Sequence, residues 1–214
     1  MTLDWEGTNK KHTLTAHRKY WANLLEEWEL TIPTSDKCYE KIQERQFNIN
    51  IDSFAGKLRH ISKTQINVYT DGSKTEHGVG AGFVVYKKGK KITEDAIPME
   101  KDNTVFQAEV EAINQATKKL NLLNTKGDMK YIKIFCDSQA AILAIKNNVT
   151  SSTLVREAIR GLNTLAANSR RVTLTWIKAH VGHDGNEEAD ALARHATTLI
   201  CLQPYPYLPH EIKK

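Results

Sequence analysis

Four acidic residues in this sequence have neighbours that point to a chemical role. Asp71 follows the β-rich run QINVYT, and Asp137 follows the β-rich run YIKIFC. Glu109 lies at the apolar stripe of an expected helix, and Asp190 lies beside small and apolar residues in another. The carboxyl ends of strands in open α/β sheets form the usual ligand crevice. Four carboxylates in one crevice would repel one another and need cations, and such hard oxygen ligands suit Mg²⁺ or Mn²⁺.

Each acid also has an ordinary structural explanation. Asp71 is typical of a turn, and Asp137 could cap the helix that follows it. Glu109 could be a partly exposed residue paired with a lysine, since Glu111 nearby is expected at the surface. Asp190 could pair with the arginine four residues later. These explanations weaken when the four acids are taken together, because a crossover topology can bring two strand ends and two helices to one place.

A glycine-rich loop, KAHVGHDGNE, precedes the last expected helix. Its histidines, His180 and His183, stand three residues apart, but no cysteine accompanies them, which argues against a zinc site. A loop histidine near a metal–carboxylate site is typical of a proton-transfer group. A loop histidine with no role is the alternative.

The elements that must position these residues follow from the hydrophobic pattern. It predicts strands over 65–70, 83–87, 91–97, 131–136 and 172–177, with a glycine-rich turn over 71–82. It predicts helices over 104–123, 138–146, 154–167 and 187–200, the first with its apolar stripe at Phe106, Val110, Ile113, Thr117 and Leu120. An antiparallel hairpin set joined to βαβ crossovers implies an α/β fold with a mixed sheet.

Composition limits the class of protein. The chain of 214 residues has a formal net charge of +5 and 40% hydrophobic residues, which favours a globular protein with a mildly basic surface. No apolar run reaches the length of a membrane span or a signal peptide, and three cysteines without a CxxC pair favour a reducing compartment. We therefore expect an intracellular protein, of the cytoplasm or nucleus, that is not secreted.

Three regions are expected along the chain. Residues 1–63 are predicted as a short helical N-terminal segment, with Trp21 and Trp28 at helical spacing. Residues 64–200 carry all the candidate site residues. Residues 201–214 contain three prolines and are expected to form a loose tail.

The acids and their flanking residues match the pattern of a known family. The segments YTDGS, QAEVEAI, FCDSQAAI and WIKAHVGHDGNEEADALAR occur in the family's order. Residues 64–200 resemble the type 1 ribonuclease H domain. The sequences of these segments are most similar to the ribonuclease H domains of non-LTR retrotransposon polyproteins, which also contain a reverse transcriptase. The resemblance implies a ribonuclease H-like sheet of five strands with helices on both faces.

The resemblance also implies an activity and a set of roles. The activity is metal-dependent endonucleolytic hydrolysis of the RNA strand of an RNA–DNA hybrid, leaving 3′-hydroxyl and 5′-phosphate ends. Two Mg²⁺ ions, for which Mn²⁺ may substitute in the family, would be held by Asp71, Glu109, Asp137 and Asp190. Asp71 would be shared by both ions, and His180 would assist proton transfer or product release.

The sequence departs from the family's pattern in the residues that would bind the RNA–DNA hybrid. The stretch between Asp137 and His180 is too short for the extra helix and basic handle of many bacterial relatives, so we expect weak binding by the chain alone. Asn103 and Gln107 are the only amides near the position where relatives contact the minor groove. We expect hybrid contacts at Gly72, Ser73 and Ser138 instead.

Further contacts and alternatives stay open. The lysines at 87, 88, 90 and 91 are either phosphate contacts or a solvated sheet edge. The expected partners are the hybrid and an upstream reverse transcriptase domain, of which residues 1–63 could be a remnant, and the chain alone is expected to be monomeric. The alternative function is a catalytically silent, domesticated module of the same fold that binds nucleic acid.

Overall fold

The computed structural model describes residues 40–41, 44–51, 65–123, 129–147, 149–169, 171–179 and 182–201. The chain divides into two units, Met1–Cys38 and Tyr39–Lys214, and all described residues lie in the second. The helix predicted around Trp21 and Trp28 and the tail after Cys201 lie outside the described residues. None of the described helices combines the length and apolar character needed to cross a bilayer.

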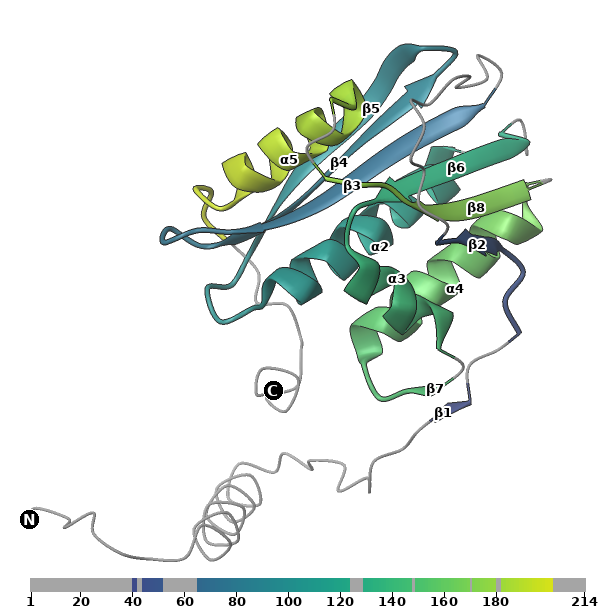
Figure 1. Cartoon of the computed structure of the whole chain (residues 1–214), viewed down its shortest axis with the longest axis horizontal. Coiled ribbons are helices and arrows are strands. Elements are labelled where there is room, and N and C mark those ends of the chain that lie inside the picture. The colour runs from purple at the N-terminus through teal and green to yellow at the C-terminus, as the bar shows by residue number, and fades with distance from the viewer. Residues whose placement is uncertain are drawn as a thin grey trace, which may run out of the picture. The chain divides into compact units, whose positions relative to one another are not determined.

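A six-stranded mixed sheet forms the centre of the second unit, in the order β2-β8-β6-β3-β4-β5 (Figure 1). Neighbouring strands from β2 to β3 run parallel, whereas β4 pairs antiparallel with β3 and β5. The strands are β2 Asn48–Asn50, β3 Ile66–Lys74, β4 Val79–Lys87, β5 Lys90–Met99, β6 Tyr131–Cys136 and β8 Arg171–Trp176. The predicted mixed α/β fold is confirmed, with one strand more than the five expected.

Helices cover both faces of the sheet. α2 (Val105–Leu123), α3 (Gln139–Lys146) and α4 (Thr153–Ala167) lie on one face, and α5 (Asp184–Ala196) lies on the other, over β3 and β4 (Figure 1). The stripe predicted for the first helix is confirmed: Val110, Ile113, Thr117 and Leu120 are buried, and Phe106 is partly buried against the core. A separate small ladder pairs β1 (Glu40–Lys41) with β7 (Val149–Thr150).

The glycine-rich stretch that was predicted as a turn is mostly strand. β3 continues to Lys74 and β4 begins at Val79, so the turn is short and is closed by the Thr75 N–H bond to the Gly78 carbonyl, 2.9 Å. The glycines stand where helices touch the sheet. A Cβ on Gly72 would lie 2.4 Å from the Glu109 nitrogen in α2, and one on Gly80 would lie 2.5 Å from the Ala193 carbonyl in α5. Their missing side chains therefore allow close helix–sheet packing.

β2 is an edge strand that the hydrophobic pattern did not reveal. It pairs with β8 over three residues, and Phe47 immediately before it is buried in the main core. The Gln46 N–H donates to Asn163 Oδ1 of α4, at 3.0 Å. Residues 44–51 thus pack with the sheet and α4.

Candidate active site

Asp71 is brought against α2 by the close approach of β3. It is 7% exposed, and the next residue, Gly72, packs on the backbone of α2 at Ala108 and Glu109. Glu109 is therefore held at the same place, also buried, on the side of the helix that faces the sheet. Its carboxylate accepts a hydrogen bond from the Cys136 thiol, with Sγ 3.8 Å from Oε2.

Asp137 reaches the same place from the end of β6. The parallel register of β3 and β6 pairs Thr70 with Cys136, so Asp71 and Asp137 are the next residues of two neighbouring segments. β6 ends at Cys136, whereas Asp71 lies within β3, opposite Gly82 of β4. Asp137 does not cap the following helix, because Ser138 is its N-cap and accepts from the Ala141 N–H at 3.3 Å. The Asp137 carboxylate is thus not used as the helix cap.

The three carboxyl groups form one cluster. Carboxylate oxygens of Asp71, Glu109 and Asp137 all lie within 4.8 Å of one another. The donor set is made of hard oxygen atoms with no sulfur or nitrogen ligand, which fits Mg²⁺ or Mn²⁺. The sequence predicted that a crossover topology brings four acids together. The structure places three of them, Asp71, Glu109 and Asp137, in one cluster.

The electrostatics of the cluster also fit a cation. Burial, followed by the charges of Asp137 and Asp190, raises the pKa of Asp71 to about 8, although the charge of Arg194 acts in the opposite direction. Burial, followed by the charges of Asp71 and Asp137, raises the pKa of Glu109 well above its ordinary value. Positive charge between these groups would favour their ionised forms.

Asp190 lies close to the cluster but not within it. It is on α5, and its carboxylate forms an ion pair with Arg194 at 2.8 Å, the helical pair that the sequence left open. Its charge raises the pKa of Asp71, which places it near that residue. Asp190 is therefore available as an outer acid of the site, although it is paired with an arginine in this structure.

The remaining predicted site residues have mixed outcomes. His180 lies outside the described residues, so its role stays a prediction. Gly72 serves the close approach to α2, and Ser73 follows it in β3, half-buried. The hydroxyl of Ser138 is used by the helix cap.

Neither amide near Glu109 is presented to solvent. Gln107 Oε1 accepts from the Thr104 N–H at 2.8 Å, and the Gln107 N–H donates to Thr104 Oγ1 at 3.2 Å, which is a capping box at the start of α2. Asn103 Nδ2 donates to the Glu100 carbonyl at 3.2 Å. Val105 is instead the exposed side chain of this turn.

Two residues that sequence reasoning missed hold Asp137. Trp176 Nε1 donates to the Asp137 carbonyl at 2.9 Å, and Asn186 Nδ2 donates to Asp137 Oδ2 at 3.2 Å. Trp176 ends β8, so its place beside β6 was available from the sheet order. Asn186 lies within the matched segment WIKAHVGHDGNEEADALAR, but its residue type and spacing did not indicate a contact with Asp137.

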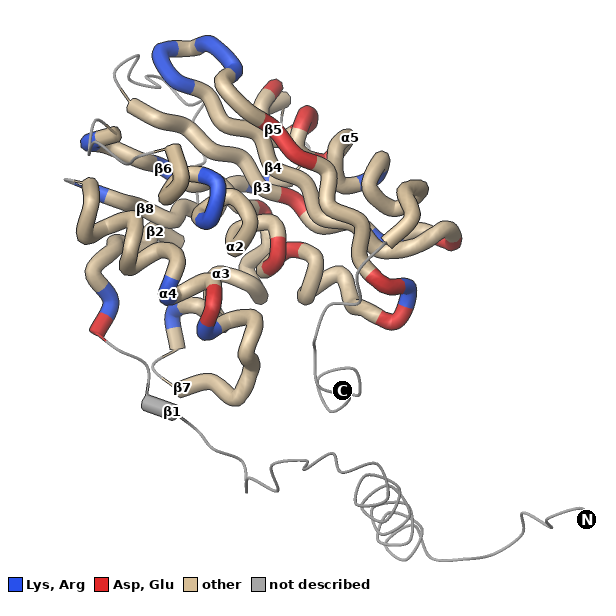
Figure 2. Tube along the Cα trace, turned by 180° about the vertical axis from the view of Figure 1, so that it is seen from behind, with Lys and Arg blue, Asp and Glu red and all other residues tan. Residues whose placement is uncertain are grey.

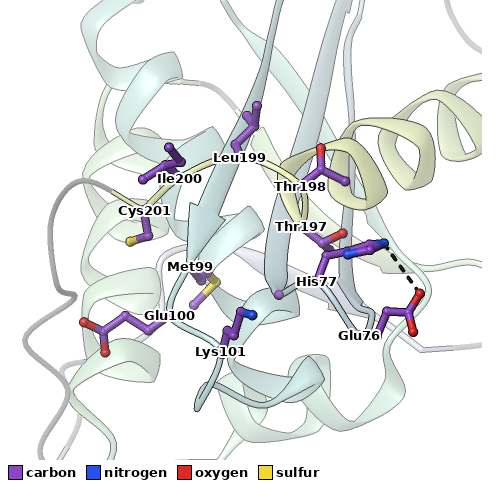
Figure 3. A pocket seen from close by; sticks show the side chains of 11 residues that line it. Glu76, His77, Met99, Glu100, Lys101, Thr197, Thr198, Leu199, Ile200 and Cys201 are labelled. Atoms are coloured by element: carbon purple, nitrogen blue, oxygen red, sulfur yellow. Dashed lines mark ion pairs between the residues drawn. The ribbon is translucent and has the colours of Figure 1, made fainter.

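A separate cavity of about 580 Å³ lies between the β3–β4 turn, the end of β5 and the end of α5 (Figure 3). Met99, Leu199 and Ile200 give it an apolar part, and His77 and Lys101 a polar part. None of the predicted site residues lines it.

The parallel crossovers, the sheet order and the clustered carboxylates define an α/β protein with an acidic centre at its central strands β3 and β6. Residues 63–198 match the family model described as RNase H. The chain belongs to the RNase H family.

Curated relatives support this membership. The chain is 33% identical over 152 residues to "Ribonuclease H" of Francisella tularensis subsp. novicida, covering 63% of this chain and 91% of that protein. It is 27% identical over 146 residues to "Ribonuclease H" of Campylobacter jejuni (strain 81-176), covering 64% and 94%. It is 27% identical over 180 residues to "Ribonuclease H" of Saccharomyces cerevisiae, covering 69% of this chain and about half (51%) of the yeast protein.

A solved structure shows the same fold. LC11-RNase H1, isolated from compost by a metagenomic approach, superposes with a TM-score of 0.51 at 23% identity, over 63% of this chain and 96% of that chain. At this identity the likeness speaks for the fold alone.

Proposed function

We propose that this chain is an endonuclease that hydrolyses the RNA strand of RNA–DNA hybrids. The observation that carries the proposal is the cluster formed by Asp71 of β3, Glu109 of α2 and Asp137, which follows β6. The family supports the hybrid as substrate, since the relatives are ribonucleases H by name. Asp71 and Glu109 are buried, at a cost in free energy that a bound cation would offset.

The proposed cofactor is a pair of Mg²⁺ ions, and Mn²⁺ is the proposed substitute. Asp71, Glu109 and Asp137 would hold them, together with Asp190 from α5. When bound, such ions activate water and stabilise the charge that develops on the phosphate.

The chain's own residues would orient the reaction. The carboxylates fix the place where a water oxygen attacks the phosphorus of the RNA strand and the bond to the 3′ oxygen breaks. The 3′ oxygen takes up a proton and the phosphate stays on the 5′ end, so the products are a 3′-hydroxyl and a 5′-phosphate. We propose that His180 moves a proton during this exchange or helps product leave.

Recognition of the RNA strand would use the backbone of β3. Because Asn103 and Gln107 are both buried and Asn103 Nδ2 and Gln107 Oε1 are bonded within their own turn, the peptide groups at Gly72 and Ser73 are the proposed contacts with the 2′-hydroxyl. Ser138 at the start of α3 is the proposed contact beyond Asp137.

The parent context is also a proposal. The residues of the motifs support a reverse transcriptase-associated domain of a non-LTR retrotransposon polyprotein, with the polymerase as the upstream partner. We place the activity inside the cell, in cytoplasm or nucleus, and expect the chain alone to be a monomer.

Cleavage of a defined hybrid tests the function. Purified protein is incubated with end-labelled RNA–DNA hybrid and Mg²⁺, beside an Asp137→Asn variant as matched control. We expect RNA cleavage with 5′-phosphate ends by the wild type only. Duplex DNA and duplex RNA in parallel test specificity. Equal cleavage by the variant would reject the proposed site, and binding of hybrid without any cleavage would favour the silent binding module.

A further inference from the structure

Asn186 contacts the candidate site from the first turn of α5. Its Nδ2 donates to Asp137 Oδ2 at 3.2 Å, and the residue is only 4% exposed. Its amide oxygen is buried without a hydrogen-bond partner in the structure. A buried amide that is only half satisfied is costly, so the bond that it does make to Asp137 calls for an explanation.

The start of α5 is fixed against the strand that carries Asp137. Gly185 packs on the ring of Tyr69, where an added Cβ would lie 2.3 Å from Cε2. Tyr69 in turn stacks on Phe135 of β6, with ring centroids 4.8 Å apart and an interplanar angle of 17°. Phe135 stands two residues before Asp137. This chain of contacts sets Asn186 at the end of β6.

The backbone of Asp137 is held separately. Trp176 Nε1 donates to its carbonyl, and the Ile177 N–H donates to the preceding carbonyl, of Cys136, at 3.0 Å. These bonds fix the position of the Asp137 backbone, but they do not set the χ torsions of its side chain. The Asn186 amide acts on one carboxylate oxygen, and so on the direction in which the other points.

We propose that Asn186 is a positioning residue, which orients the Asp137 carboxylate for cation binding. Hydrogen-bond partners behind a metal ligand fix its geometry, and their loss typically costs 10- to 100-fold in metal affinity or activity. The inference rests on the proposed function for its catalytic consequence. Its metal-binding part can be tested without turnover.

Binding of Mn²⁺ to the full chain, followed by electron paramagnetic resonance and titration calorimetry, is the direct test. Asn186→Leu removes the amide at similar size, and Asn186→Asp keeps the shape but loses the N–H donors. We expect each to weaken Mn²⁺ binding about 10- to 100-fold. Glu187→Gln, an exposed change in the same helical turn, is the matched control and should leave binding within twofold.

Two further measurements separate positioning from folding and from the proposed activity. Thermal unfolding of the metal-free variants reports a purely structural role; a folded Asn186 variant that binds Mn²⁺ like the wild type overturns the inference. If Asn186→Leu does not fold, the isosteric Asn186→Asp decides by the same criterion. Absence of hybrid cleavage by the wild type, with Mn²⁺ binding lost in the variants, would reject the proposed function and leave the positioning role standing.

Discussion

Asp71 stands where burial and charge oppose its ionised form. Desolvation is the first cause of its raised pKa, and the neighbouring acids Asp137 and Asp190 add to it. Glu109 is subject to the same causes. The folded protein therefore binds protons at this cluster that the unfolded chain would release, unless a cation takes their place.

Stability of the metal-free protein should fall as pH rises. Asp71 has a folded pKa of about 8 against an ordinary 3.8, so its contribution is fully present below pH 3.8 and is lost as pH rises through 8. Replacing it in Asp71→Asn removes the ionisation. We expect the variant, in EDTA, to be more stable than the wild type at pH 8.5 by about 1–2 kcal/mol, or roughly 2–8 °C in Tm.

The measurement is thermal unfolding between pH 5 and 8.5. The slope against pH should be shallower for Asp71→Asn, with a remainder from Glu109. Saturating Mg²⁺ should raise the Tm of the wild type at pH 8.5 more than that of the variant. Parallel pH profiles for the two proteins would contradict the assigned environment of Asp71.

Residue types in the sequence indicated the cluster of acids, but they did not indicate the surroundings of every acid near it. Asp71, Glu109 and Asp137 could be found from the sequence because an acid at a strand end or beside an apolar stripe is unusual. The expectation that Glu111 is a surface acid is wrong: it is fully buried, and Asn114 Nδ2 donates to its carboxylate at 3.1 Å. Helix periodicity alone could not show this, because α4 covers that side of α2.

Glycines at the element scale decide how close the helices come. The hydrophobic pattern predicted the helices within a few residues, since their apolar stripes are long. It misplaced the ends of β3 and β4, because glycine is as typical of turns as of strands in close contact with a helix. Only the contacts of Gly80 and Gly82 with α5 distinguish the two cases.

A methyl group at Gly80 should therefore separate α5 from β4. Its Cβ would meet the Ala193 carbonyl and the Ala196 Cβ, each at 2.5 Å. We expect Gly80→Ala to lower the free energy of unfolding by about 1–3 kcal/mol in urea denaturation. It should also weaken Mn²⁺ binding, because α5 carries Asp190 and Asn186.

Gly89 offers the control for that variant. Its φ is +74°, and no atom lies within 4 Å of an added Cβ. Asparagine tolerates this backbone conformation, so Gly89→Asn should change stability by less than about 0.5 kcal/mol. An equal effect of the two substitutions would mean that close packing of α5 is not what Gly80 serves.

At the scale of the whole molecule, the sheet extends beyond the segment that carries the motifs. β2 contributes three residues, too few for a period-two pattern, and its pairing with β8 joins residues that are far apart in the chain. No local signal could have predicted it. Phe47 nevertheless belongs to the main core and is 6% exposed.

Loss of the Phe47 ring should destabilise the sheet without altering the site. We expect Phe47→Ala to lower the free energy of unfolding by about 3 kcal/mol, from lost burial and the cavity left behind. Leu143→Ala, at a position 48% exposed in α3, should cost far less. Cleavage per folded molecule should stay unchanged, since Phe47 touches none of the clustered acids. A stability change as small as that of Leu143→Ala would show that β2 is dispensable.

Charge, too, is a property of the whole molecule. The basic residues of the turn between β4 and β5 gather away from the acidic cluster (Figure 2). The register pairs Asp71 with Gly82 but Ile66 with Lys87, so about 17 Å of strand separates Asp71 from the turn, at about 3.3 Å per residue. Lys91 there is already paired with Glu94 and Glu188. A net charge of only +5 and this divided distribution favour weak, salt-dependent binding of a polyanion.

Hybrid binding by the Asp137→Asn variant should therefore fall steeply with salt. Three to four phosphate contacts correspond to a loss of roughly 40- to 150-fold in affinity between 50 and 200 mM salt. Fluorescence anisotropy with a labelled hybrid measures it without cleavage. Lys88→Gln and Lys90→Gln together should flatten the slope if the β4–β5 turn contacts phosphate, and leave it unchanged if that turn is only a solvated edge. Tight binding that ignores salt would contradict the expectation that this fold, without a basic handle, grips the hybrid weakly.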